Sequence, residues 1–293
     1  MATLAAVEAA FPTWHFHPDV WTLIVLLAGA YWLVLRRETA RNGGKPAATR
    51  WQKVAFAAGV ATLFAASDWP IHDLGEGYLY SAHMVQHLLV TLVAAPLLLL
   101  GTPSWLVRRL LSPKWLLAIV KTVARPAPNL IQANVVLVLS HWPVIVEGTL
   151  RHHPLHFVAH AVLLTSALIM WLPVVSPHPD IPRLPPILQM LYLFLQTIIP
   201  TVPASFLTLG HGLLYPIYGE FPRLWGISAI TDQQVAGLIM KIGAGMYLWA
   251  IIGVIFFRWY ADEERKPPEV LLWDDVEREL KRLDRPPRPS EIG

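Results

Sequence analysis

Residues 80–103 read YSAHMVQHLLVTLVAAPLLLLGTP, and this stretch decides the fold class. It contains no Asp, Glu, Lys or Arg, and its second half is almost entirely apolar. About 20 consecutive, mostly apolar residues are enough for a helix to cross a bilayer. His83, Met84 and His87 stand near the start of the run. The stretch therefore predicts a transmembrane helix with imidazole and thioether groups in its first turns.

Six further apolar stretches have a similar character. With the first they run over residues 20–35, 54–66, 80–100, 130–146, 155–172, 187–209 and 235–257. Only 15% of all residues are charged and 55% are hydrophobic, whereas a soluble domain carries about 25% charged residues. The sequence excludes a soluble protein and predicts an all-α, polytopic membrane protein with seven transmembrane helices in the lipid bilayer.

The segment 104–125 lies between the third and fourth predicted spans and has a different pattern. Apolar side chains alternate there with five Lys and Arg, so the segment is too often charged to cross a bilayer. Such an amphipathic pattern is typical of a helix lying in the membrane interface. We expect one interfacial helix between spans three and four.

The positive charges predict the orientation. Twenty of the 23 Lys and Arg fall on one side of the predicted spans, in residues 36–53 and 108–125, at Arg183 and from Arg258 onward. Because cytoplasmic segments carry the excess of Lys and Arg, the N-terminus is expected outside and the C-terminus in the cytoplasm. This gives a membrane domain over 1–259 and a cytoplasmic tail over 260–293, and the charges need no nucleic-acid partner to explain them.

Eleven of the 12 histidines then fall on the outer side, and only His178 is cytoplasmic. His83 and His87, like His156 and His160, are four residues apart, a spacing that puts each pair on one helix face. His87, His141 and His160 would lie at similar depth, about 8–10 Å inside the outer boundary. His72 is expected in the loop before the third span.

This clustering predicts a metal site. Imidazole is the commonest metal ligand in proteins, and ionisable groups inside a membrane usually face the bundle interior. The chain has no Cys, which excludes thiolate zinc sites, and thioethers favour Cu(I). Copper is the predicted metal. The candidate ligands are His83, His87, His156, His160, His141 and His72, and the candidates for a ligand or a supporting role are Met84, Met240 and Asp232.

Alternatives stay open for these residues. Histidines of facing helices can hold a haem as axial ligands, although this leaves the paired spacing unexplained. They can equally be hydrogen-bond partners between helices, and methionines can simply pack. Asp232 begins the last span, where it could cap the helix N-terminus or orient an imidazole. No phosphate loop or nucleophile motif is present, so we expect no enzyme.

Two stretches resemble the CtaG-type assembly factors of cytochrome c oxidase. They are residues 80–103, quoted above, and DQQVAGLIM at 232–240. The resemblance covers roughly residues 14–260. His83, Met84, His87, Asp232 and Met240 match motif positions of the family, and His156 and His160 match a histidine pair. Lys241 departs from the family pattern, which commonly has Trp there.

The resemblance implies a membrane protein needed to mature haem–copper oxidase. Its partners would be oxidase subunits and other copper chaperones, and it would help to deliver copper on the outer, periplasmic side of the bacterial cytoplasmic membrane. A haem-binding electron carrier and a metal-free structural assembly partner remain the alternatives.

Overall fold

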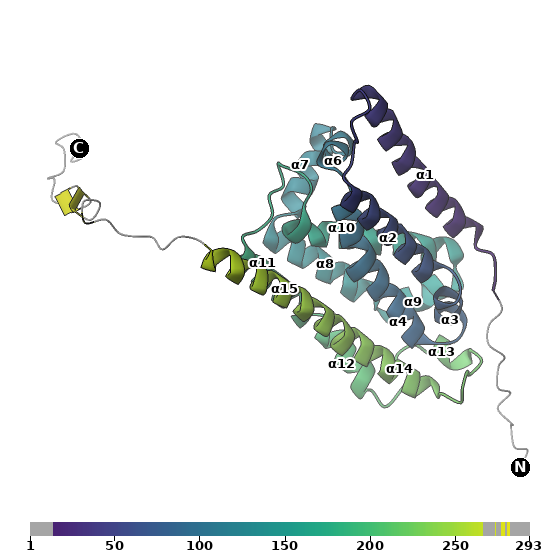
Figure 1. The fold of residues 1–293 in the computed structure, drawn as a ribbon. Coiled ribbons are helices and arrows are strands. Elements are labelled where there is room, and N and C mark those ends of the chain that lie inside the picture. The colour runs from purple at the N-terminus through teal and green to yellow at the C-terminus, as the bar shows by residue number, and fades with distance from the viewer. Residues whose placement is uncertain (1–13, 266–272, 274–276, 279, 282–293) are drawn as a thin grey trace, which may run out of the picture. The chain divides into compact units, whose positions relative to one another are not determined.

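The structure, a computed structural model, describes residues 14–265, 273, 277–278 and 280–281, and every regular element within them is a helix (Figure 1). The helices are α1 (Pro18–Arg41), α2 (Arg50–Ser67), α3 (Ile71–Gly77), α4 (Tyr80–Leu88), α5 (Ala95–Gly101), α6 (Ser104–Leu110), α7 (Lys114–Val123), α8 (Pro126–Ser140), α9 (Pro143–Arg151), α10 (His153–Val175), α11 (Pro186–Ile198), α12 (Thr201–Leu209), α13 (Ile217–Glu220), α14 (Ala229–Leu238) and α15 (Ala244–Glu264). Two π-helical segments, η1 (Leu89–Ala94) and η2 (Ile239–Gly243), continue α4 into α5 and α14 into α15.

Contacts divide the chain into one unit over Met1–Ile255 and a second over Phe256–Gly293. All of the candidate ligands lie in the first unit. Much of the predicted tail, 260–293, lies outside the described residues, so the predicted boundary at 259 stays a prediction.

The predicted membrane-spanning, all-helical class is confirmed for the described residues. Six helical stretches are long and apolar enough to span a bilayer, and a seventh is added if α8 and α9 count as one span. The six are Pro18–Arg41, Arg50–Gly77, Tyr80–Gly101, His153–Val175, Pro186–Leu209 and Ala229–Glu264. The described residues thus contain six or seven candidate membrane spans, as expected of a multi-pass membrane protein, and the orientation stays a prediction.

The fourth predicted span, 130–146, is not one straight helix. α8 ends at Ser140, and α9 begins at Pro143 with its axis bent by 64°. The residue before a proline is driven out of the helical region, and Trp142 has extended backbone angles (φ −71°, ψ 131°). His141 therefore occupies the corner between two helices.

The loop expected to carry His72 is also helical. Residues 71–77 form α3, with Asp73 in its first turn, where a carboxylate stabilises the helix dipole. In this helix His72 and Glu76 are four residues apart and share one face. The segment 104–125, expected as a single helix, consists of α6 and α7 with a break at 111–113, and its interfacial position stays a prediction.

α3 lies directly against α4 because of one glycine. A Cβ on Gly75 would be 3.0 Å from the backbone N and Cα of His83, which is tighter than nine in ten real Cβ contacts. The hydroxyl of Tyr218 donates to the Gly75 carbonyl at 2.8 Å. This close approach brings the polar face of α3 beside the histidines of α4.

Candidate metal centre

Five imidazoles from three helices meet in the interior of the bundle. His83 and His87 lie on α4, His141 follows α8, and His156 and His160 lie on α10. The ring centroids are 4.2 Å apart for His83–His87, 4.4 Å for His156–His160, 5.4 Å for His87–His160 and 5.6 Å for His87–His141. The structure therefore brings together residues that are distant in sequence, including the three expected at similar depth.

A small cavity lies among four of these rings. It has a volume of ≈ 20 Å³, and its lining includes His83, His87, His156 and His160. One water molecule needs roughly 10–15 Å³, so this space suits a single ion or water. Organic cofactor sites are far larger, at about 300–1,000 Å³.

The ring nitrogens of this cluster lack partners to an unusual degree. Each of the five rings has a buried nitrogen without a hydrogen-bond partner among the described residues: His83 Nδ1, His87 Nδ1, His141 Nε2, His156 Nδ1 and His160 Nε2. Nε2 of His156 also makes no hydrogen bond, although Glu76 Oε1 lies 2.8 Å from it. More than 90% of buried polar groups in proteins are hydrogen-bonded. One such atom could be incidental, but five in one cluster indicate a ligand.

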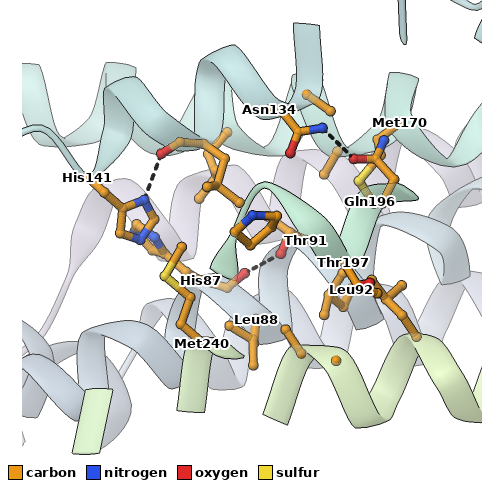
Figure 2. Close-up of a pocket in the computed structure, with 18 of the residues that line it drawn as sticks. His87, Leu88, Thr91, Leu92, Asn134, His141, Met170, Gln196, Thr197 and Met240 are labelled. Atoms are coloured by element: carbon orange, nitrogen blue, oxygen red, sulfur yellow. Dashed lines mark hydrogen bonds between the residues drawn. The ribbon is translucent and has the colours of Figure 1, made fainter. Parts of the chain in front are cut away.

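His141 is held in an orientation that suits metal binding (Figure 2). Its Nδ1 lies 2.7 Å from the carbonyl oxygen of Leu137, to which the ring donates. The proton is then on Nδ1, and the unpartnered Nε2 carries the lone pair. Metal-binding histidines typically donate their second ring nitrogen to a carbonyl or carboxylate in this way.

His72 and Glu76, both on α3, extend the cluster and add a carboxylate to it. Glu76 Oε1 lies 2.8 Å from Nε2 of His156 and 3.3 Å from Nε2 of His72. Of all described residues, only these three form a group of at least three His or acidic residues whose ligand atoms lie within 4.8 Å of one another. Beside them His17 Nε2 contacts Asp73 Oδ1 at 2.7 Å, and its ring centroid is 4.8 Å from that of His72.

Sequence reasoning missed Glu76. Its signal is the spacing of four residues from His72, the same spacing that marks the two histidine pairs. Residues 71–77 were expected to form a loop, and in a loop two residues at this spacing do not share a face.

Asp232 has a role that was not foreseen. It lies in the first turn of α14, whose N-cap is Ser228. Its carboxylate accepts from the backbone N–H of Tyr80 at 2.6 Å and of Ser81 at 3.1 Å, and from the Ser81 hydroxyl at 2.5 Å. Asp232 thus caps the N-terminus of α4, three residues before His83, where a carboxylate is favourable.

Met84 and Met240 are almost completely buried, at 1% and 3% exposure, and belong to one apolar cluster. Both also line a pocket of ≈ 90 Å³ together with His87 and His141 (Figure 2). The thioethers therefore pack in the core and at the same time lie next to the inner end of the histidine cluster.

A π-helical segment follows each of the two helices α4 and α14 beside this pocket. η1 begins two residues after His87, and η2 contains Met240. The indole N–H of Trp171 donates to the carbonyl of Thr91 within η1 at 2.9 Å, which satisfies a backbone group there. Single-turn π segments occur frequently at functional sites.

The fold and the site together define a class: a multi-pass helical membrane protein with a buried centre of histidines and one carboxylate. A family model described as cytochrome c oxidase caa3 assembly factor (Caa3_CtaG) matches residues 29–262, and the chain belongs to this family. The resemblance seen in the sequence is thereby confirmed. No curated protein and no solved structure matches the chain.

Proposed function

We propose that this oxidase assembly factor binds copper in its histidine cluster and helps to deliver it to the oxidase. The cluster comprises His83, His87, His141, His156, His160 and His72, with Glu76 added by the structure. The role is that of a metallochaperone, which binds and transfers its cargo and catalyses no reaction.

One observation carries the proposal: each of the five imidazole rings has a buried nitrogen without a hydrogen-bond partner, and four of these rings line the ≈ 20 Å³ cavity. Neutral imidazole suits copper as a ligand, and the thioethers of Met84 and Met240 nearby suit its univalent form. The chain has no Cys, so this is copper binding without thiolate.

The haem alternative has less support. A cavity of ≈ 20 Å³ among the imidazoles leaves no space for a macrocycle. Two axial ligands would also leave the unpartnered nitrogens of the other three rings unexplained. A metal-free structural role requires ordered water at these atoms instead. It predicts that exchanging His for Gln leaves oxidase maturation intact.

The proposal also states where copper is delivered and which protein receives it. Following the distribution of Lys and Arg, the cluster faces the outside of a bacterial cytoplasmic membrane. There it would meet the copper-receiving part of an apo-oxidase subunit, and other copper chaperones would load it.

The test is copper content per chain in purified protein, measured under reducing and under oxidising conditions. His83→Ala combined with His87→Ala should lower copper content at least about tenfold and lower oxidase activity in cells, with the helical content unchanged. The matched control is His152→Ala combined with His211→Ala, which removes two exposed imidazoles. Wild-type protein that holds no copper under either condition contradicts the proposal.

A further inference from the structure

The outer and inner parts of the histidine cluster differ in charge. At the outer end Glu76 lies between His72 and His156. In the inner part no described ion pair joins a carboxylate to an imidazole. The inner imidazoles are His83, His87, His141 and His160, and the thioethers of Met84 and Met240 line the adjoining pocket.

The outer group has the dimensions of a metal site. Metal–nitrogen and metal–oxygen bonds of roughly 2.0–2.2 Å place tetrahedral ligands about 3.3 Å apart. The two distances from Glu76 Oε1 to the imidazoles are 2.8 and 3.3 Å, so an ion fits between the three side chains after small movements.

Gln86 contacts the ring of His72 on the side away from Glu76. It is fully buried, its Nε2 lies 3.1 Å from Nδ1 of His72, and its Oε1 has no partner. If the side-chain amide of Gln86 is rotated by 180°, its Oε1 accepts a hydrogen bond from Nδ1–H of His72. The lone pair on Nε2 of His72 then faces Glu76. Such a partner fixes the ring of a metal-binding histidine.

Charge then decides which ion each part accepts. The free-energy cost of moving an ion into a low-dielectric interior rises with the square of its charge, and a paired opposite charge offsets it. The outer group supplies one carboxylate and two imidazoles, a ligand set that suits a divalent ion. The inner group supplies only neutral ligands, and thioether and imidazole together suit Cu(I).

We propose that the cluster contains two separable cation sites: an outer site of His72, Glu76 and His156 for a divalent ion, and an inner site of His83, His87, His141 and His160 for a soft univalent ion. This inference deepens the proposed copper-handling function and rests on it. Each site takes up its own ion from outside the protein, so the proposal needs no transfer of electrons between the two sites.

Separate cavities lie beside the two sites and share histidines in their linings. A pocket of ≈ 230 Å³ is lined by His72, His156 and His160, with the exposed Asp19 and His153 also on its wall. The ≈ 20 Å³ cavity shares His156 and His160 with it, and shares His87 with the ≈ 90 Å³ pocket beside the methionines. Imidazoles thus form the common wall at each step from the outer site inward.

The test uses the full chain in lipid nanodiscs and two redox-inert probes, Co²⁺ for a divalent ion and Ag⁺ for Cu(I). Calorimetry and the visible spectrum of Co²⁺ report each ion. The wild type should bind both ions at once, so that one equivalent of Ag⁺ leaves the Co²⁺ spectrum unchanged. One-for-one displacement of Co²⁺ by Ag⁺ shows a single shared site and overturns the inference without any variant.

Two variants separate the sites. Glu76→Gln should weaken Co²⁺ binding at least about tenfold and change Ag⁺ binding less than about threefold. His87→Gln combined with His141→Gln should do the reverse. Glu220→Gln, at an exposed carboxylate 4.0 Å from Arg151, is the control and should change neither. Equal loss of both ions in the Glu76 variant overturns the inference.

Failure of the proposed copper-handling function would give a different result from failure of the two-site inference. Wild-type protein that binds neither Co²⁺ nor Ag⁺ removes the copper-handling function together with both sites. Protein that binds both ions but competitively keeps the copper-handling function and loses only the division into two sites.

Discussion

The carboxylate of Glu76 on α3 lies 2.8 Å from Nε2 of His156 on α10. This contact joins two helices that are far apart in the sequence, and it puts the negative charge at the outer end of the histidine cluster. Among the described residues, Glu76 is the only carboxylate paired with His72 or His156.

Replacement of Glu76 by Gln should reduce oxidase activity in cells grown with scarce copper. The amide keeps the size of the side chain but removes the charge that attracts the ion. Excess copper in the medium should restore activity, because a weakened site fills at higher concentration. Oxidase activity against copper concentration measures this, and a defect that copper does not correct contradicts it.

Gly75→Ala should disturb both stability and metal binding. The new Cβ would lie 3.0 Å from the backbone of His83, which pushes α3 away from α4 and costs about 1–3 kcal/mol. Gly77→Ala is the matched control in the same helix, because nothing lies within 4 Å of a Cβ there. Unfolding in mixed micelles should show a lower stability, and Co²⁺ titration a weaker metal binding, for Gly75→Ala but not for Gly77→Ala. Equal behaviour of the two variants would show that the close approach is unimportant.

Asp232→Ala should destabilise the protein by about 1–3 kcal/mol, because it leaves the backbone N–H groups of Tyr80 and Ser81 at the start of α4 without this acceptor. Asp180→Ala provides the comparison. It breaks an exposed pair with Lys121 at 3.6 Å, and such pairs contribute about 0–1 kcal/mol. Denaturant titration measures both variants. If Asp232→Ala loses copper without any loss of stability, its carboxylate acts on the metal rather than on the helix.

Tyr215→Phe should weaken the inner site and leave the outer site intact. The Tyr215 hydroxyl donates to the His141 carbonyl at 2.8 Å and holds the corner between α8 and α9. Burial raises the pKa of Tyr215 to about 12, so the phenol stays protonated and keeps donating even at about pH 10, where a free Tyr is half ionised. We expect a severalfold loss of Ag⁺ affinity, measured by calorimetry, with unchanged Co²⁺ binding. Unchanged Ag⁺ affinity would mean that the corner is rigid without this bond.

Much of the arrangement was predictable because it follows from local rules. The spans follow from apolar length, and the faces of His83/His87 and His156/His160 follow from helical spacing. Since these segments do form helices, residues of each pair had to lie together, and the membrane left the bundle interior as the favourable place for their rings.

What was not predictable depends on tertiary contacts or on short helices. Residues 71–77 have too few apolar positions to show a helical period, so the alignment of Glu76 with His72 was hidden. Asp232 satisfies the N-terminus of a different helix, which no spacing within its own helix could indicate. The break at Pro143 is a local signal that the long apolar run around it concealed.

The most direct test of the central claim is copper analysis combined with an absorption spectrum on one sample of the purified protein. The account predicts bound copper, lost in the His83→Ala and His87→Ala double variant, and no Soret band. A Soret band without copper, or a sample with neither copper nor haem after copper loading, contradicts it.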